Sequence, residues 1–335
     1  MITLAVIGFG YWGPNLVSNF ASLETCRVKT IVEFQPARLA SARKLYPQIQ
    51  ATASVEDVWR DAEIDAVVLA VPVAWHYSFA KTALQHGKHV LVEKPLTANS
   101  AEARELCDLA QQQQRCLMVD HTFLYTGAVK KMKRLIDDGT LGVMQYFDSV
   151  RINLGLFQQD INVLWDLAPH DIAILNYLLP EPVQSVVATG ISHTPNRIEN
   201  IAYLTLFYQS DLIAHVSVSW TSPVKIRKIL LGGTQKMLMY DDLEPTEKIR
   251  LYDTGYQVAS AEEKNTMLVD YRIGDIMIPK IEMTEALRGM AHDFVQAIQH
   301  GTPPLADAAS GAAVVRILEA AEQSIKQRGR EVTLA

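Results

Sequence analysis

Two short groups of residues in this 335-residue chain combine side chains that can move protons and orient hydroxyl groups. In the first, Glu93-Lys94-Pro95, a lysine follows an apolar run and precedes a proline, which fixes the local backbone and can form a cis peptide bond. The second is Asp166 and His170, which would share one face of a helix because they are four residues apart. Histidine titrates near neutral pH, so this pair could exchange a proton with a substrate. A purely structural hydrogen bond would explain the pair equally well.

A glycine-rich segment, Gly8-Phe9-Gly10-Tyr11-Trp12-Gly13, lies between an apolar run and a helical pattern. In dinucleotide-binding loops the first glycine allows a tight turn, the second admits a pyrophosphate and the third permits close helix packing. The start of the helix then offers unpaired amides to the phosphates. Glu33 lies 20 residues after Gly13, where an acidic side chain meets the ribose hydroxyls and repels a 2′-phosphate. The sequence therefore predicts NAD rather than NADP, although Arg38 and Arg43 are close enough to weaken this preference.

The elements that would position these residues differ between the two parts of the chain. Up to residue 122, near-continuous apolar strands alternate with helical patterns, which is typical of a doubly wound parallel sheet. The expected strands are Leu4–Ile7, Lys29–Val32, Ala66–Ala70, His89–Val92 and Cys116–Val119, and the expected helices are Asn15–Ala21, Ala37–Tyr46, His76–His86 and Glu102–Gln113. Asn99 and Glu102 have the spacing of a capping box. Lys94 would then lie at the carboxyl end of a strand, where open α/β sheets bind ligands.

After residue 122, apolar residues recur at every second position, which predicts a largely antiparallel sheet with one face left open. The expected strands are Val143–Leu154, Val183–Thr189, Ile201–Tyr208, Leu212–Trp220, Ile226–Leu231, Lys236–Tyr240 and Lys248–Tyr252. The expected helices are Gly127–Asp138, Val163–Leu179, Thr284–Gln299 and Ala308–Gln327. Pro169 should lie in the first turn of its helix. We predict an α/β protein: a Rossmann domain over 1–122 and a substrate-binding and oligomerisation domain of α+β type over 123–335.

Composition limits the kinds of partner that the chain can have. A net charge of −6, with 20% charged residues, argues against binding to nucleic acid, which needs clustered Lys and Arg. No segment reaches the ~20 apolar residues of a membrane-spanning helix, and the N-terminus lacks the pattern of a signal peptide, so a cytoplasmic location is expected. The three cysteines form no CxxC pair, and no grouping of histidines suggests a metal site.

The glycine loop, the Glu93-Lys94-Pro95 triplet and the Asp166 and His170 pair, in this order and spacing, resemble the Gfo/Idh/MocA oxidoreductase family. The resemblance covers essentially the whole chain and includes Pro72 and His76 after a strand. It implies an NAD(P)-dependent dehydrogenase that acts on a CH–OH group of a sugar or cyclitol. It also implies roles: Lys94 polarises the reacting oxygen, His170 exchanges the proton and Asp166 holds the substrate or the histidine. Unlike the common family pattern, no glycine pair precedes Asp166.

Parts of the chain are most similar to members that act on the 3-position of nucleotide sugars, as UDP-N-acetylglucosamine 3-dehydrogenases do. These parts are residues 8–15, 164–171 and 219–242, including Trp220 and the segment Lys225-Ile226-Arg227. The alternatives are an inositol or free-sugar dehydrogenase, a glycosidase that oxidises and reduces its substrate transiently, and a regulator that binds the cofactor without catalysis.

Several further residues are candidates for ligand contact. His121 follows a strand end, Arg151 and Asn153 alternate on one face of a strand, and Trp165 precedes Asp166, so all four could border the substrate; packing or solvent exposure would explain them as well. Pro72, His76 and Glu93 could border the cofactor together with the glycine loop and Lys94. The open sheet also needs cover, so a homodimer or homotetramer through that face is expected.

Overall fold

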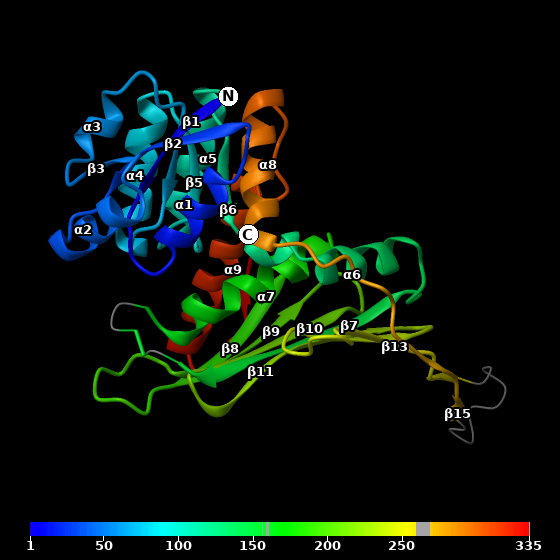
Figure 1. Ribbon diagram of the computed structural model, residues 1–335. Helices are drawn as coiled ribbons and strands as arrows, with labels where there is room; N and C mark the ends of the chain where they lie inside the picture. Colours follow the sequence, from blue (N-terminus) through cyan, green and yellow to red (C-terminus); the bar gives the residue numbers. More distant parts are fainter. Residues whose placement is uncertain (156, 159–160, 259–268, 335) are drawn as a thin grey trace. The chain divides into compact units, whose positions relative to one another are not determined.

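The computed structural model describes residues 1–155, 157–158, 161–258 and 269–334 (Figure 1). The chain divides into two compact units. The first consists of Met1–Thr126 with Thr284–Glu319, and the second of Gly127–Met283 with Ala320–Ala335. The sequence predicted spans of 1–122 and 123–335, so the main difference is the segment 284–319.

The first unit is built on a six-stranded parallel sheet with the order β3-β2-β1-β4-β5-β6. This is the strand order of a doubly wound dinucleotide-binding domain, as predicted. The strands are β1 Ile2–Ile7, β2 Cys26–Val32, β3 Gln50–Thr52, β4 Ala66–Leu69, β5 His89–Glu93 and β6 Leu117–Asp120. The helices are α1 Gly13–Ala21, α2 Pro36–Leu45, α3 Glu56–Trp59, α4 Val73–Gln85, α5 Ser100–Gln112, the 3-10 helix η1 Thr122–Tyr125 and α8 Ala286–His300.

Helix α8 belongs to the first unit because it packs on α1 and η1. Figure 1 draws it in orange, close to the N-terminus. The rings of Phe20 and Phe294 meet edge to face with centroids 6.2 Å apart. The Tyr125 hydroxyl donates a hydrogen bond of 2.7 Å to Asp293. These contacts join residues far apart in the sequence, which explains why the sequence pattern assigned this helix to the second domain. The following helix, α9 Ala308–Lys326, contributes residues to both units.

The second unit contains a nine-stranded sheet with the order β16-β13-β12-β11-β7-β10-β9-β8-β17. All of its neighbouring strands are antiparallel except β7 and β10, which confirms the predicted largely antiparallel sheet. The strands are β7 Met144–Leu154, β8 Ser185–Ile191, β9 Ile201–Phe207, β10 Ile213–Ser219, β11 Thr221–Gly233, β12 Met237–Asp241, β13 Ile249–Tyr252, β16 Ile276–Met277 and β17 Val332–Thr333. A separate hairpin pairs β14 Gly255–Val258 with β15 Val269–Arg272.

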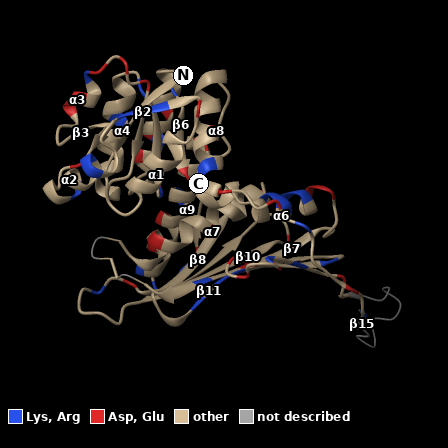
Figure 2. Ribbon diagram, in the orientation of Figure 1, with Lys and Arg blue, Asp and Glu red and all other residues tan. Residues whose placement is uncertain are grey.

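Two helices of the second unit, α6 Gly127–Asp137 and α7 Val163–Leu178, lie on the same side of this sheet (Figure 1). Helix α7 packs on β7, β9 and β10, and the side chains facing it, such as Leu204 and Val216, are buried. Figure 2 shows Lys and Arg scattered over both units, with a short group on α6. Among the described residues, no helix is long and apolar enough to cross a membrane.

Candidate functional site

The glycine loop connects the buried strand β1 to helix α1, and its glycines are required by the local geometry. Gly8 has a φ of +100°, and a Cβ at this position would collide with the carbonyl oxygen of Ala70. A Cβ on Gly13 would collide with the carbonyl oxygen of Gly8. Gly10 differs, because a Cβ there would meet only a guanidinium nitrogen of Arg38, at 3.4 Å. The loop is therefore tightly packed at its two ends and open in the middle.

Glu33 follows β2 and connects it to the glycine loop. Its side chain is buried, with 5% exposure, and its Oε2 accepts the amide of Phe9 at 2.8 Å. Its Oε1 accepts the amide of Gln35, also at 2.8 Å. Each carboxylate oxygen keeps a second lone pair, so the group can still accept a ribose hydroxyl. In the loop itself, Phe9 is buried, whereas the rings of Tyr11 and Trp12 are exposed and meet edge to face.

His76 is buried in α4 and does not point into solvent. Its Nδ1 lies 2.8 Å from the carbonyl oxygen of Pro95, and its Nε2 lies 2.8 Å from that of Val71. It thus connects the turn after β4, where Pro72 precedes α4, to the turn after β5. Burial lowers the pKa of His76, and a neutral ring can donate to only one of the two carbonyl groups.

The turn after β5 contains Lys94, and the Lys94–Pro95 peptide bond is cis, as the sequence suggested. Glu93 is the register partner of Asp120 at the end of β6, and their two carboxyl groups are close enough to interact directly. His121 follows with 2% exposure, and neither ring nitrogen has a partner among the residues that the structure describes. Burial, followed by the charge of Lys94, lowers the pKa of His121 to about 4. Four titratable side chains therefore meet at the carboxyl edge of the parallel sheet.

In the second unit, Asp166 and His170 lie one helical turn apart on α7, which confirms their predicted common face. The indole Nε1 of the buried Trp220 donates a hydrogen bond of 3.0 Å to Oδ2 of Asp166. The helix begins at Val163, so Pro169 lies in its interior, and the expectation that this proline occupies the first turn was wrong. Without an N–H, Pro169 leaves the carbonyl group four residues earlier without its helical hydrogen bond.

Arg151 on β7 forms a buried, two-pronged ion pair with Asp171 on α7. Its Nε lies 2.6 Å from Oδ2, and its NH2 lies 3.1 Å from Oδ1. Burial and these two charge-assisted bonds fix the helix residue next to His170. Asn153 continues the same face of β7, because alternate residues of a strand point to one side.

The start of α7 is capped by Asn162, whose side-chain oxygen accepts the amides of Leu164 and Trp165 at 3.1 and 3.2 Å. Trp165 is buried, and its Nε1 donates to Glu322 at 3.0 Å. Capping and packing thus anchor the turn that carries Asp166.

Comparison with known proteins assigns both parts of the chain to one family. Residues 2–121 match the "Oxidoreductase family, NAD-binding Rossmann fold" model, and residues 129–239 match the "GFO/IDH/MocA C-terminal domain". The chain belongs to the Gfo/Idh/MocA oxidoreductase family. It is an oxidoreductase with an NAD-binding Rossmann domain.

Relatives along the whole chain have different substrates. The UDP-N-acetylglucosamine 3-dehydrogenase of Acidithiobacillus ferrooxidans is 26% identical over 95% of this chain and 94% of its own length. The scyllo-inositol 2-dehydrogenase (NADP(+)) IolW of Bacillus subtilis is 24% identical over 98% and 94%. Among solved structures, levoglucosan dehydrogenase in complex with NADH and levoglucosan has a TM-score of 0.85 at 20% identity, over 99% of both chains. The last comparison shows the fold alone.

Within this Gfo/Idh/MocA chain, the structure adds residues that sequence reasoning did not select. Asp120 and Asp171 lie next to the candidates His121 and His170 but were not themselves predicted as site residues. Strand register pairs Asp120 with Glu93, and packing of α7 on β7 pairs Asp171 with Arg151; the sequence alone indicates neither pairing. Trp220 was noted as part of a similar segment, but its bond to Asp166 was not foreseen.

Proposed function

We propose that this enzyme transfers hydride between NAD and a secondary hydroxyl group of a sugar, at the 3-position of a nucleotide sugar such as UDP-N-acetylglucosamine. The whole-length relative from Acidithiobacillus ferrooxidans supports this substrate class. The observation that supports the chemistry most directly is the Asp166 and His170 pair on one face of α7, with Asp166 held by Trp220.

The proposed cofactor residues are those of the glycine loop and Glu33, with Pro72, His76 and Glu93 at the neighbouring strand ends. The tight packing of Gly8 and Gly13, the open position of Gly10 and the free lone pairs of Glu33 fit a dinucleotide. NAD, when bound, supplies the nicotinamide that accepts or donates the hydride. The burial of Glu33 against the loop also supports NAD over NADP.

The proposed chemical roles belong to Lys94, His170 and Asp166. The ammonium group of Lys94 binds the reacting oxygen and stabilises the negative charge that develops on it. The imidazole of His170 takes the proton of the hydroxyl group during oxidation and returns it during reduction. Asp166, fixed by Trp220, orients the substrate or His170. His121, Asn153 and Trp165 are proposed to border the substrate, whereas the ion pair with Asp171 gives Arg151 a supporting role.

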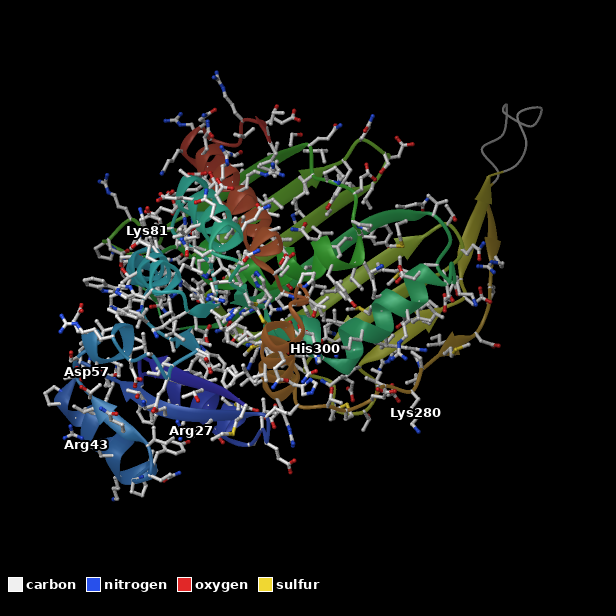
Figure 3. All side chains as sticks on the ribbon, turned by 90° about the horizontal axis from the view of Figure 1, so that it is seen from above. Arg27, Arg43, Asp57, Lys81, Lys280 and His300 are labelled. Atoms are coloured by element: carbon white, nitrogen blue, oxygen red, sulfur yellow. The ribbon has the colours of Figure 1, made fainter. Side chains whose placement is uncertain are left out.

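A panel of nucleotide sugars, free sugars and inositols, followed at the absorbance of NADH, tests this proposal. We expect turnover of nucleotide sugars, and a loss of about 100-fold or more in kcat/KM for His170→Ala and for Lys94→Ala. His300→Ala and Lys280→Ala are matched controls, because both residues are exposed (Figure 3) and neither is a candidate. Faster turnover of inositol or free glucose would favour that class, as the IolW relative suggests. NADH binding without turnover of any sugar would favour a regulator.

A further inference from the structure

The carboxyl edge of the parallel sheet contains a pair of acids to which the proposed proton transfer assigns no role. Glu93 ends β5 and Asp120 ends β6, and the two residues are register partners on adjacent parallel strands. Their carboxyl groups are close enough to interact directly. A hydrogen bond between the two groups can form only if the pair retains one proton, because two ionised carboxylates have no hydrogen atom to donate.

The surroundings of the pair favour retention of that proton. Asp120 is buried with 4% exposure, and Oε1 of Glu93 is buried with no partner among the described residues. Burial, followed by the negative charge of Asp120, raises the pKa of Glu93 well above its ordinary value. Burial also raises the pKa of Asp120, although a hydrogen bond from the Thr122 hydroxyl opposes this. Two buried carboxylates in contact cannot both be ionised at neutral pH without a large cost.

The charged and titratable groups that face the pair come from every element around it. Lys94 follows β5, His121 follows β6, and Tyr125 of η1 lies close enough to feel the charge of Asp120. The Tyr125 hydroxyl is itself bonded to Asp293 of α8. Lys94 supplies the positive charge near the pair. If Glu93 and Asp120 retain one proton, their single remaining negative charge balances the ammonium group of Lys94.

A direct contact connects the pair to Lys94, because the carboxyl group of Glu93 accepts the backbone N–H of Lys94. We propose that Glu93 and Asp120 share one proton in the working enzyme and that this dyad positions Lys94. The part of this proposal that concerns catalysis rests on the proposed role of Lys94. The shared proton itself does not, and it can be tested without substrate.

The first test is infrared spectroscopy of the protein alone at neutral pH, where a protonated carboxyl group has a C=O stretch that a carboxylate lacks. We expect this band in the wild type, its loss at alkaline pH, and its absence in Glu93→Gln and in Asp120→Asn. In each variant the amide supplies the hydrogen atom, so the remaining acid ionises. Glu105→Gln is the matched control, because Glu105 is exposed and pairs with Lys81, which Figure 3 labels, so its loss should leave the band unchanged. A wild type without the band, or a band that persists in both variants, would overturn the proposal.

The second test is the pH dependence of kcat/KM on the substrate that the panel identifies. Asp120→Asn can still donate to Glu93, so we expect it to lose less activity than Asp120→Ala, by at least tenfold. We also expect the alkaline decrease of the wild type, caused by loss of the shared proton, to be absent from Asp120→Asn. Equal losses in both variants with an unchanged pH profile would contradict a positioning role. If no substrate is found, the infrared result still decides whether the proton is shared, so the two proposals fail separately.

Discussion

At the scale of single residues, the protonation of His121 opposes folding. Its buried ring has no hydrogen-bond partner among the described residues, and burial, with a smaller effect from Lys94, lowers its pKa from 6.5 to about 4. The unfolded chain binds a proton here below about pH 6.5, whereas the folded protein does so only below about pH 4. We therefore expect the free energy of unfolding to decrease as the pH falls through this window, by about 3 kcal/mol at most.

Chemical denaturation between pH 7 and pH 4 measures this effect. The His121→Gln variant should show a shallower decrease in the free energy of unfolding than the wild type, because glutamine does not titrate. His300→Gln, an exposed position at the end of α8, should have the wild-type slope. Equal slopes in the wild type and His121→Gln would show that His121 does not remain neutral in the folded protein.

The sequence selected individual residues well where short motifs exist and poorly where partners come from distant segments. Asp166 and His170 share a helix face as expected, because their spacing alone determines it. Arg151 was predicted to be able to contact substrate. Its ion-pair partner Asp171 could not be recognised from the sequence, because it lies 20 residues away on a helix. Asp120 was not selected, because only the strand register places it beside Glu93.

At the scale of elements, substitutions in the glycine loop can distinguish effects on folding stability from effects on cofactor binding. A Cβ at Gly10 meets only the Arg38 side chain, at 3.4 Å, so Gly10→Ala should fold with nearly the wild-type Tm. The methyl group would nevertheless stand where the backbone must approach a pyrophosphate, so the Kd for NADH should rise about tenfold or more. Gly13→Ala should raise the Kd and also lower the Tm, because its Cβ collides with the backbone at Gly8.

Calorimetric melting and NADH fluorescence titration of the two variants provide this comparison. Gly289→Ala on α8 is a suitable control, since its Cβ would meet only the Tyr125 side chain, at 3.4 Å and beyond. If Gly10→Ala binds NADH as tightly as the wild type does, the pyrophosphate does not lie over this loop.

The sequence predicted helices and strands correctly where buried apolar residues recur at regular intervals. The alternating and continuous apolar runs predicted the main strands, and the side chain of Asn99 caps α5 by accepting the amide of Glu102, as its spacing predicted. Strand β3 was missed, because it has only three residues and no fully buried side chain. The position of Pro169 inside α7 was also not foreseen, since tertiary packing of the helix outweighs the lost hydrogen bond.

At the scale of the whole molecule, the nine-stranded sheet has one face covered by α7 and another that exposes apolar side chains. Successive residues of β9 face opposite sides of the sheet: Leu204 and Leu206 are buried, whereas Tyr203 is 49% exposed. The ring of Tyr203 stacks on that of His215 on β10. Ile213 and Ile191 on the same sheet are 44% and 55% exposed. Exposed apolar side chains on one face of a sheet are typical of a surface that binds another protein, and a second copy of the chain is a common solution.

We therefore expect the native mass, measured by light scattering, to be two or four times the chain mass of 37.3 kDa. Ile213→Arg places a charge on the exposed sheet face, so it should shift the mass towards that of a single chain. Leu45→Arg, at an exposed apolar position at the end of α2, should leave the mass unchanged. A single-chain mass for the wild type, or an unaltered oligomer in Ile213→Arg, would mean that this face does not form the interface. Because α7, which carries the proposed proton-transfer residues, packs on the opposite face of the sheet, Ile213→Arg should lower the Tm but leave the Kd for NADH close to that of the wild type.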